Sequence, residues 1–339
     1  MGTPFLTIGI ASYNYAKWLM IAFEAIQRQT FKDFEILYCD DGSTDESVAV
    51  IQKIIQNHPN MSIRLVQGKN GGVMENKNRI LDHARGEYVM LCDADDWMQD
   101  NCLELLCNAA KSTGADQVAG AFQNVDENGH ILQVQEIPKH PVKWTWGIHH
   151  ATIYKMSVIQ KYHLRMSKEY YPDDVYFNLL FHEHSGETVF INDILYNWCV
   201  HDDSASSRKA QKSNWTGYAM LKSILPYMRN LFDEQQNVKD WEELEYMACK
   251  IYALAVFYRY TGGNFNDFFQ EYKLCEALMA QCFDKYLWNP ALRKIDGNGY
   301  VRKRSAHIIW GLGFLERTHL IRPALWGYWK LSHFIKMGI

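Results

Sequence analysis

Acidic residues gather at two places in the sequence, each directly after a short apolar run. Asp40 and Asp41 follow the run Phe34–Cys39, and an Asp-Ala-Asp-Asp cluster at 93–96 follows the run Tyr88–Cys92. Two carboxylates that lie two positions apart can hold one divalent cation together with the oxygens of a diphosphate, and Mg²⁺ or Mn²⁺ suits such ligands. The same residues could also be surface loop carboxylates or helix caps, and a short acidic pattern alone does not separate these interpretations.

The elements that would carry these clusters alternate along the chain. Four apolar runs predict buried strands at Phe5–Ala11, Phe34–Cys39, Met61–Val66 and Tyr88–Cys92. Helices are predicted between them at 18–26, from about Thr44, where residues 43–46 have a capping-box pattern, and at 73–84. This alternation predicts an α/β fold with a parallel sheet and helices on both of its faces. Ligands of such sheets bind at the carboxyl ends of the strands, so we expect both acidic clusters to border one cleft.

The pattern changes after residue 115. Two strands at Val118–Val125 and His130–Val134 flank a turn at 126–129 and predict a hairpin. Helices are predicted near 156–163 and at 175–184, and the pattern is helical from about residue 211 to the end.

Six short segments carry a specific resemblance. They are Ala11-Ser12-Tyr13-Asn14, Gln29-Thr30-Phe31-Lys32-Asp33-Phe34-Glu35-Ile36, Asp40-Asp41-Gly42-Ser43-Thr44-Asp45, Asn70-Gly71-Gly72-Val73, Arg85-Gly86-Glu87-Tyr88 and Asp93-Ala94-Asp95-Asp96-Trp97. In this order and spacing they resemble the inverting glycosyltransferases of family 2, over about residues 5–205. The resemblance implies the GT-A fold, an α/β fold with a Rossmann-like, mixed nucleotide-binding sheet. We therefore predict a catalytic domain at 1–205, with a nucleotide-sugar-binding part at 1–97 and an acceptor-binding part at 98–205, and a C-terminal helical region at 206–339.

The resemblance implies roles on the donor side of the site. Asp41 would accept a hydrogen bond from the imide N–H of uracil, so the expected donor is a UDP-sugar. Ala11-Ser12-Tyr13 would line the base pocket, and Asp93-Ala94 would bind the ribose side of the nucleotide-sugar. The family usually has proline where Ala11 stands, a backbone departure that changes little in this assignment.

The resemblance also implies a metal and diphosphate site. Asp95 would hold Mn²⁺ or Mg²⁺ between the two phosphates and so neutralise the leaving UDP. His201 lies in a segment similar to the family's downstream His-x-x-Ser element, where a neutral imidazole can add a metal ligand; without the upstream motifs it would be read as a surface histidine. Ser204 and Ser206 would bind the diphosphate. Lys77 stands where the family often has arginine, and its ammonium can still neutralise phosphate but lacks the bidentate fork.

An acidic pair follows Pro172 at the predicted start of a helix. By resemblance, Asp174 is the general base and Asp173 lies on the acceptor side. A carboxylate there would remove the acceptor's hydroxyl proton as the oxygen attacks C1 of the sugar in line with departing UDP, which inverts the anomeric centre. The competing interpretation is that both carboxylates only favour the positive end of a helix dipole.

A tryptophan- and histidine-rich stretch at 144–150 is the expected acceptor wall. The rings of Trp144 and Trp146 could stack on sugar C–H surfaces and His149 could bond hydroxyl groups, although core packing explains either tryptophan nearly as well. No metal partners are spaced around His149 and His150, so a second metal site is not predicted there.

The formal net charge of −4 conceals an uneven distribution. Residues 286–339 hold nine Lys/Arg and two Asp/Glu, against 26 and 37 in the rest of the chain. The acidic body argues against a general nucleic-acid partner. At 300–339, basic and aromatic residues recur with helical spacing, which predicts an amphipathic helix on an anionic membrane surface. The alternatives are packing on the catalytic domain or on a second copy of the chain.

Cysteine usage and hydropathy indicate the compartment. Eight cysteines are spread without a CxxC pair, as expected for reduced thiols in a cytosolic protein. The apolar run at the N-terminus is too short for a signal peptide, and no 18-residue apolar stretch exists. We expect a cytoplasmic protein, peripheral on the inner face of the plasma membrane.

Together these patterns predict a metal-dependent inverting glycosyltransferase. It would move a hexose or N-acetylhexosamine from a UDP-sugar to a hydroxyl of a cell-surface glycan or lipid-linked acceptor. A nucleotidyltransferase is the alternative enzyme, but it would normally carry a Gly-rich basic phosphate loop where Ser12-Tyr13-Asn14 stands. A non-catalytic protein that binds nucleotide-sugars or glycans is the alternative of a different class.

Overall fold

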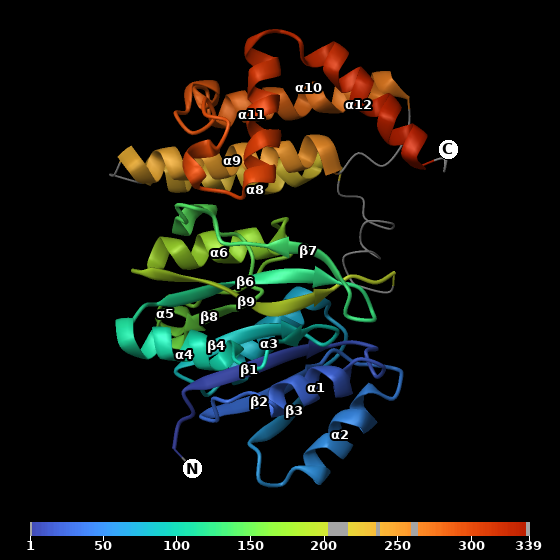
Figure 1. The fold of residues 1–339 in the computed structure, drawn as a ribbon, viewed down its shortest axis with the longest axis vertical. Coiled ribbons are helices and arrows are strands. Elements are labelled where there is room, and N and C mark those ends of the chain that lie inside the picture. The colour runs from blue at the N-terminus through green and yellow to red at the C-terminus, as the bar shows by residue number, and fades with distance from the viewer. Residues whose placement is uncertain (1, 203–215, 235–237, 259–263, 337–339) are drawn as a thin grey trace. The chain divides into compact units, whose positions relative to one another are not determined.

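The computed structural model of the chain describes residues 2–202, 216–234, 238–258 and 264–336 (Figure 1). Its residues divide into two compact units. The first unit comprises residues 1–137, 146–168 and 173–208, and the second comprises 138–145, 169–172 and 209–339. Two short segments, 138–145 and 169–172, therefore leave the first unit and return to it.

One mixed sheet forms the centre of the first unit. Its described strands are β1 (Leu6–Ser12), β2 (Phe34–Asp40), β3 (Ile63–Gln67), β4 (Tyr88–Asp93), β5 (Trp97–Met98), β6 (Gln117–Val125), β7 (Ile131–Gln135), β8 (Thr152–Lys155) and β9 (Thr188–Cys199). They lie in the order β3-β2-β1-β4-β8-β6-β9-β5, and β7 pairs with β6. β1 to β4 are mutually parallel, β8 runs antiparallel to both β4 and β6, and β9 runs parallel to β6.

Helices cover both faces of this sheet, as the sequence predicts. The described helices of the unit are α1 (Leu19–Gln27), α2 (Ser47–Asn57), α3 (Val73–His83), α4 (Cys102–Thr113), α5 (Met156–Lys161) and α6 (Asp173–His184). Side chains of α1, α2 and α4 form one buried cluster with alternate residues of β1, β2 and β4. The remaining residues of β2 and β4 point to the other face and pack with α3, α5 and α6. Strands buried on both faces read as continuous apolar runs, which is why they stand out in the sequence.

Most of the predicted elements are confirmed, and one helix start is wrong. The β6–β7 hairpin forms as expected. α2 begins at Ser47 rather than near Thr44, because residues 43–45 are held in a turn instead. The Asp40 carboxylate accepts hydrogen bonds from the backbone N–H of Ser43, and the side-chain oxygen of Asn14 accepts the backbone N–H of Thr44. The sequence patterns gave no prediction for β5, β8, β9 or α4.

Helices make up most of the second unit. It contains α8 (Gly217–Glu234), α9 (Val238–Tyr258), α10 (Phe265–Cys282), α11 (Lys303–Arg317) and α12 (Ile321–Lys336), with short 3₁₀ turns at Lys143–Thr145, Tyr286–Trp288 and Gly297–Gly299. The carboxylate of Glu316 on α11 is buried and accepts hydrogen bonds from three tyrosine hydroxyls, those of Tyr252, Tyr272 and Tyr286. These hydrogen bonds connect α9, α10 and α11. The predicted C-terminal helical region is confirmed.

All eight cysteines lie among the described residues, where they are buried and have free thiols. In the same part of the chain, no helix is both long enough and apolar enough to cross a bilayer.

The end of the sheet opposite the acidic clusters is held by Glu35 of β2. Its buried carboxylate accepts the hydroxyl of Thr7 at 2.8 Å and the Nε–H of Arg64 at 3.0 Å. The Thr7 hydroxyl in turn accepts the backbone N–H of Gly86 at 2.8 Å, just before β4. A Cβ atom at Gly86 would lie 2.4 Å from the backbone nitrogen of Thr7, so no larger side chain fits.

We therefore expect Gly86→Ala to lower the free energy of unfolding of the first unit by about 1–3 kcal/mol, because neither backbone segment can yield without breaking ladder hydrogen bonds. Urea unfolding followed by circular dichroism measures this change. Arg85→Ala is the matched control, since it alters the exposed neighbouring side chain and leaves the close approach intact. Equal stability of the two variants would contradict the steric explanation.

Candidate active site

The register of the parallel strands brings the two acidic clusters together. Ser12 at the end of β1 pairs with Asp40 of β2, and Ala11 pairs with Asp93 of β4. The two clusters therefore meet at one edge of the sheet, as the expectation of a shared cleft requires. The backbone N–H of Asp41 donates to the Ser12 carbonyl at 2.9 Å, which extends the pairing by one residue.

Asp41 holds a glycine loop in place. Its buried carboxylate accepts the backbone N–H of Gly71 at 3.0 Å and that of Gly72 at 2.7 Å, and it lies 3.4 Å from the Arg79 guanidinium. A carboxylate has about four lone-pair positions, and the two glycine N–H groups and Arg79 already make four hydrogen bonds to it, two at each oxygen. The two residues expected to line the base pocket with it differ in exposure, because Ser12 is buried and Tyr13 is half-buried.

Asp95 and His201 face each other across the sheet edge. Nε2 of His201 lies 2.9 Å from Oδ2 of Asp95, and both side chains are almost fully buried. The imidazole also lies against the Trp18 ring, with 4.8 Å between ring centroids. The sequence prediction placed these two residues at one metal ion, and the structure brings them into contact. Ser204 and Ser206 lie outside the described residues.

A chain of close contacts connects Asp93 with Asp174 through two basic side chains. Nζ of Lys77 lies 3.0 Å from Oδ1 of Asp93 and 2.6 Å from Nε2 of His149. Nδ1 of His149 lies 3.0 Å from Oδ1 of Asp174. Its ring N–H is not aligned well enough for a hydrogen bond, so this contact is an ion pair. Lys77 and His149 are 2% exposed, whereas the Asp93 and Asp174 side chains are 31% and 27% exposed.

These contacts control the charge of each group. Burial raises the pKa of Asp93 and of Asp174, but the cations Lys77 and His149 outweigh it and hold the pKa of both carboxyls well below the usual range. Burial lowers the pKa of His149, yet the carboxylates of Asp174 and Asp93 outweigh it and raise that pKa to about 9. Burial opposes the charge on Lys77, and the surrounding carboxylates, Asp93 foremost, raise its pKa nevertheless.

The side chains of His150 and Asp96 lie next to these four residues and are kept neutral. The ring of His150 stacks on Trp198 with 5.1 Å between centroids, and Nε2 lies 3.7 Å from Oδ2 of Asp96. Burial and the positive charge of His149 lower the pKa of His150 to about 3. Burial and the neighbouring Asp95 and Asp93 raise the pKa of Asp96 well above its ordinary value.

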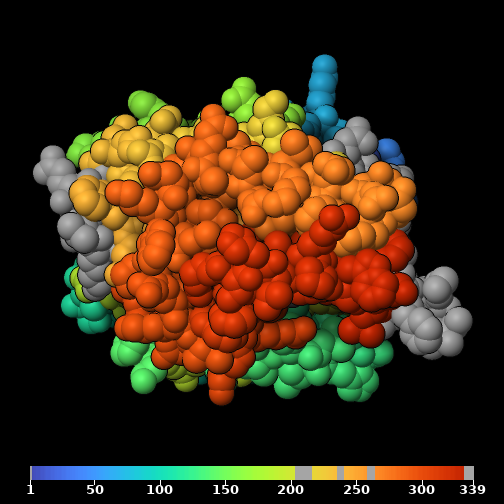
Figure 2. All heavy atoms as spheres, turned by 90° about the horizontal axis from the view of Figure 1, so that it is seen from above, coloured from blue at the N-terminus to red at the C-terminus, as the bar shows by residue number. Residues whose placement is uncertain are grey.

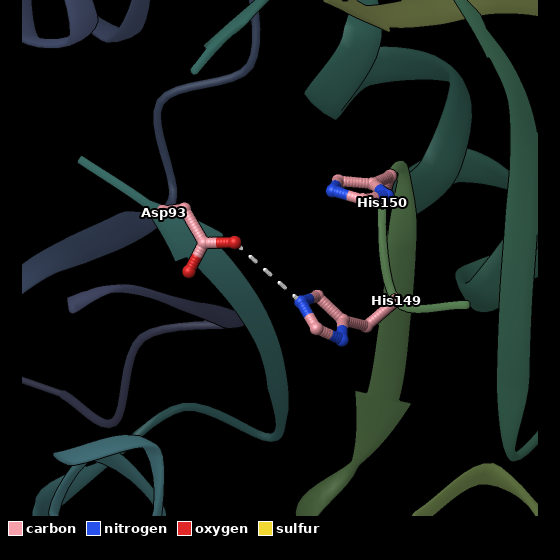
Figure 3. A group of neighbouring side chains, drawn as sticks. All are labelled: Asp93, His149 and His150. Carbon is pink, nitrogen blue, oxygen red and sulfur yellow. Dashed lines mark ion pairs between the residues drawn. The ribbon is translucent and has the colours of Figure 1, made fainter. Parts of the chain in front are cut away.

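Asp93, His149 and His150 could form a metal site by their spacing alone. Figure 3 shows the three side chains, whose ligand atoms lie within 4.8 Å of one another. Sequence spacing gave the two histidines no such partner, because Asp93 is far away in the chain. However, the Lys77 ammonium already contacts both Asp93 and His149, and a divalent ion there would have to displace it. We therefore do not assign these residues as metal ligands.

The two tryptophans of the expected acceptor wall belong to different units of the structure. Trp146 is buried in the first unit, where its ring packs edge-on against Phe190, as core packing requires. Trp144 belongs to the second unit, and its indole N–H donates to Asp240 at 3.2 Å. Asp173 is half-buried in the first turn of α6, beside Asp174.

The first unit of the chain is similar to proteins of a known family. The family model described as "Glycosyl transferase family 2" matches residues 7–190, more than half of the chain. The chain belongs to this family. This is the family that the motifs of the sequence resemble.

Two curated relatives show the range of the family. The chain is 28% identical over 220 residues to a hyaluronan synthase of Pasteurella multocida, covering 62% of this chain and 22% of that protein. It is 23% identical over 279 residues to a GalNAc(5)-diNAcBac-PP-undecaprenol beta-1,3-glucosyltransferase of Campylobacter jejuni, covering 79% and 86%. The chain spans only about a fifth of the length of the synthases that it matches first.

Two solved structures confirm the GT-A fold. Residues 1–349 of S. aureus TarS in complex with UDP-GlcNAc superpose with a TM-score of 0.61 at 16% identity, covering 93% of this chain and 92% of that one. The mannosyltransferase PcManGT of Pyrobaculum calidifontis, in complex with GDP-Man and Mn²⁺, gives a TM-score of 0.56 at 12% identity, covering 93% and 88%. At such identities the likeness concerns the fold.

The contacts that connect these residues leave no trace in the sequence motifs. Lys77 is predicted there to bind phosphate and His149 to bind the acceptor, and neither motif nor spacing indicates that the two side chains touch. The available signal was chemical, since a lysine inside an otherwise apolar helix face requires a buried carboxylate or another acceptor.

The buried Asp96 gives this site a testable pH dependence. In the unfolded chain Asp96 ionises near its ordinary pKa of about 3.9, so the wild type loses stability as the pH rises from there toward the raised native value. The asparagine introduced by Asp96→Asn cannot ionise, and its side-chain oxygen can still accept the Cys199 N–H that Asp96 accepts at 2.9 Å. Both proteins are to be measured in EDTA. We expect the thermal unfolding midpoint of Asp96→Asn minus that of the wild type to increase between pH 5 and pH 8.

Asp100→Asn is the matched control, because that carboxylate is exposed and pairs only at the surface with Arg28. Its midpoint relative to wild type should change little over the same range. An Asp96→Asn difference that is constant with pH would contradict the raised pKa.

Proposed function

We propose that the protein is a metal-dependent inverting glycosyltransferase with Asp174 as its general base. The observation that carries this proposal is the chain of contacts from Asp93 through Lys77 and His149 to Asp174. Asp93 belongs to the acidic cluster proposed to bind the donor, and Asp174 lies at the start of a helix. Both carboxylates therefore border the same two buried basic side chains. Inverting transfer needs a base on the side of the sugar carbon opposite the leaving nucleotide, and this is the role that we propose for Asp174.

The proposed donor is a UDP-sugar, a UDP-hexose or UDP-N-acetylhexosamine. Asp41 would bind the uracil imide N–H in exchange for one of the donors that it now holds, of which the Arg79 guanidinium at 3.4 Å is the most distant. Ala11-Ser12-Tyr13 and Asp93-Ala94 would complete the nucleotide site. TarS, which shares the fold, was solved with UDP-GlcNAc, whereas PcManGT was solved with GDP-Man, so the base must be tested directly.

Asp95 and His201 are the proposed metal ligands. A carboxylate and an imidazole that already lie 2.9 Å apart in a buried position form a donor set that suits Mn²⁺ or Mg²⁺. When bound, the ion would neutralise negative charge on the diphosphate of the leaving nucleotide. Ser204 and Ser206 would add hydroxyl contacts to the same phosphates. PcManGT, with the same fold, was solved with Mn²⁺.

The proposed acceptor is a hydroxyl of a cell-surface glycan or a lipid-linked glycan. The name of the Campylobacter relative specifies an undecaprenol-linked acceptor. In the transfer step, Asp174 takes the hydroxyl proton as the acceptor oxygen forms a bond to C1, and the bond from C1 to the phosphate oxygen breaks with its electrons going to UDP. Asp173 remains a proposed acceptor contact.

We expect Asp174→Asn to lower kcat by about 10²–10⁴-fold, because the amide cannot take the proton. UDP release from a panel of UDP-sugars with Mn²⁺ or Mg²⁺ measures this loss, and EDTA should abolish the wild-type signal. Asp116→Asn is the control variant, since that carboxylate forms an ion pair with Lys155 away from the four charged groups described above.

Turnover of a GDP- or dTDP-sugar and of no UDP-sugar would contradict the base-pocket assignment. Full activity of Asp174→Asn would contradict the general base. Binding of nucleotide-sugars without turnover would favour the non-catalytic alternative.

We further propose that α12 binds an anionic membrane surface, which would make the enzyme peripheral on the inner face of the plasma membrane. Arg322, Trp326, Lys330 and Leu331 are the residues of this helix that the surface would use, and the Lys330 ammonium lies 4.1 Å from the Trp326 ring centroid. Figure 2 shows a face of the second unit on which the atoms of α11 and α12 lie together. Cations among exposed apolar side chains match a surface of anionic headgroups over acyl chains.

Vesicle flotation tests this surface with the full chain. We expect the wild type to float with vesicles that contain phosphatidylglycerol and to float less with phosphatidylcholine alone. Leu331→Ser combined with Lys330→Glu should reduce flotation severalfold, whereas Ile131→Ser, which removes an equally exposed side chain from β7, should not. Unchanged flotation of the double variant would overturn the proposal, and its conversion from dimer to monomer would identify a second copy as the occupant instead.

A further inference from the structure

The exposure of His149 and Asp174 separates their roles. The His149 side chain is 2% exposed, whereas that of Asp174 is 27% exposed, so Asp174 faces the space that a ligand can reach and His149 lies behind it. The contact uses only Oδ1 of Asp174, which leaves Oδ2 for an acceptor hydroxyl. This arrangement does not suit the direct contact between His149 and an acceptor that the sequence suggested.

The neighbours of His149 determine which ring nitrogen carries a proton. The Lys77 ammonium can donate but cannot accept, so a neutral ring must accept it at Nε2 and keep its proton on Nδ1. A protonated ring carries a proton on Nδ1 as well. In both charge states, therefore, an N–H at Nδ1 faces the Asp174 carboxylate.

We propose that His149 is a positioning residue that holds Asp174 in the orientation needed to take the acceptor proton, with Lys77 fixing the histidine from behind. This inference rests on the proposed function of Asp174 and adds a residue to it. The N–H of His149 is imperfectly aligned with Oδ1 in the free enzyme. Such contacts commonly tighten when substrates bind, so the alignment is expected to improve in the ternary complex.

The charged groups around the pair define what its loss would do. Asp174 faces the cations His149 and Lys77 and the neutral His150, and His149 faces Asp174, Lys77 and Asp93. Removing the His149 ring takes away a cation that holds the pKa of Asp174 down. The acidic limb of the kcat profile therefore moves to higher pH, while the rate at its plateau falls because the base is no longer held in place.

A double-mutant cycle tests this coupling. We expect His149→Ala to lower kcat by about 10–100-fold, the loss that removing the hydrogen-bonding partner of a metal ligand typically causes. The KM for the donor should stay within about threefold. His149→Asn should recover part of the rate, because its amide N–H can occupy the place of Nδ1. In the Asp174→Asn background, His149→Ala should cause little further loss.

An equal loss of kcat from His149→Ala in both backgrounds would overturn the proposal, as would a change confined to KM. His130→Ala is the matched control. His130 forms an equally close pair with Asp126, at 2.9 Å, but on the exposed β6–β7 hairpin, and its loss should leave kcat unchanged.

A second measurement does not require turnover. In protein labelled with ¹⁵N-histidine, the imidazole spectrum of His149 should show a protonated Nδ1, and Asp174→Asn should lower its pKa and shift its signals while those of His130 stay in place. An unprotonated Nδ1, or signals that Asp174→Asn does not move, would overturn the pairing. If no sugar is transferred by the wild type, the proposed function fails, and this spectrum still decides whether the two side chains are paired.

Discussion

A buried ammonium group constrains the whole site. Taking a cation out of water costs several kcal/mol unless opposite charges surround it at close range. Lys77 is 2% exposed, so Asp93 must stay ionised beside it. The His149 ring must accept a hydrogen bond from the ammonium at Nε2 or share one proton with it. These partners lie on β4 and just before β8, and through His149 the constraint reaches the start of α6. One charge thus fixes the relative positions of four separate segments.

The sheet reduces the conformational cost of this arrangement. Parallel pairing of β1, β2 and β4 brings Ser12, Asp40 and Asp93 to one edge without any contribution from the loops. At the opposite ends of the same strands, Glu35 and the Thr7 hydroxyl fix the close approach of Gly86. The strands are therefore held at both ends, and the loops that carry the proposed ligands begin from fixed positions.

The parts of this structure that sequence reasoning found are those with a local signal. Strands buried on both faces are visible as apolar runs, and the Asp-x-Asp cluster is visible as a spacing. The predicted start of α2 is wrong because two residues outside the capping-box pattern at 43–46 hold residues 43–45 in a turn. Asp40 accepts the backbone N–H of Ser43, and Asn14, distant in the chain, accepts that of Thr44. The pairing of β5 with β9 joins segments about a hundred residues apart. The contact between His149 and Asp174 likewise has no local trace, and Trp146 could not be assigned to core or cleft until its burial was known.

The route of the chain from α6 into β9 has a consequence of its own. Asp174 lies in the first turn of this helix, and His201 lies two residues beyond the end of the following strand. The helix leads away from the edge of the sheet and the strand leads back to it. One continuous stretch of the chain therefore supplies both Asp174, the proposed general base, and His201, a proposed metal ligand. A change in the length of that stretch would therefore displace the proposed base and the proposed metal ligand together.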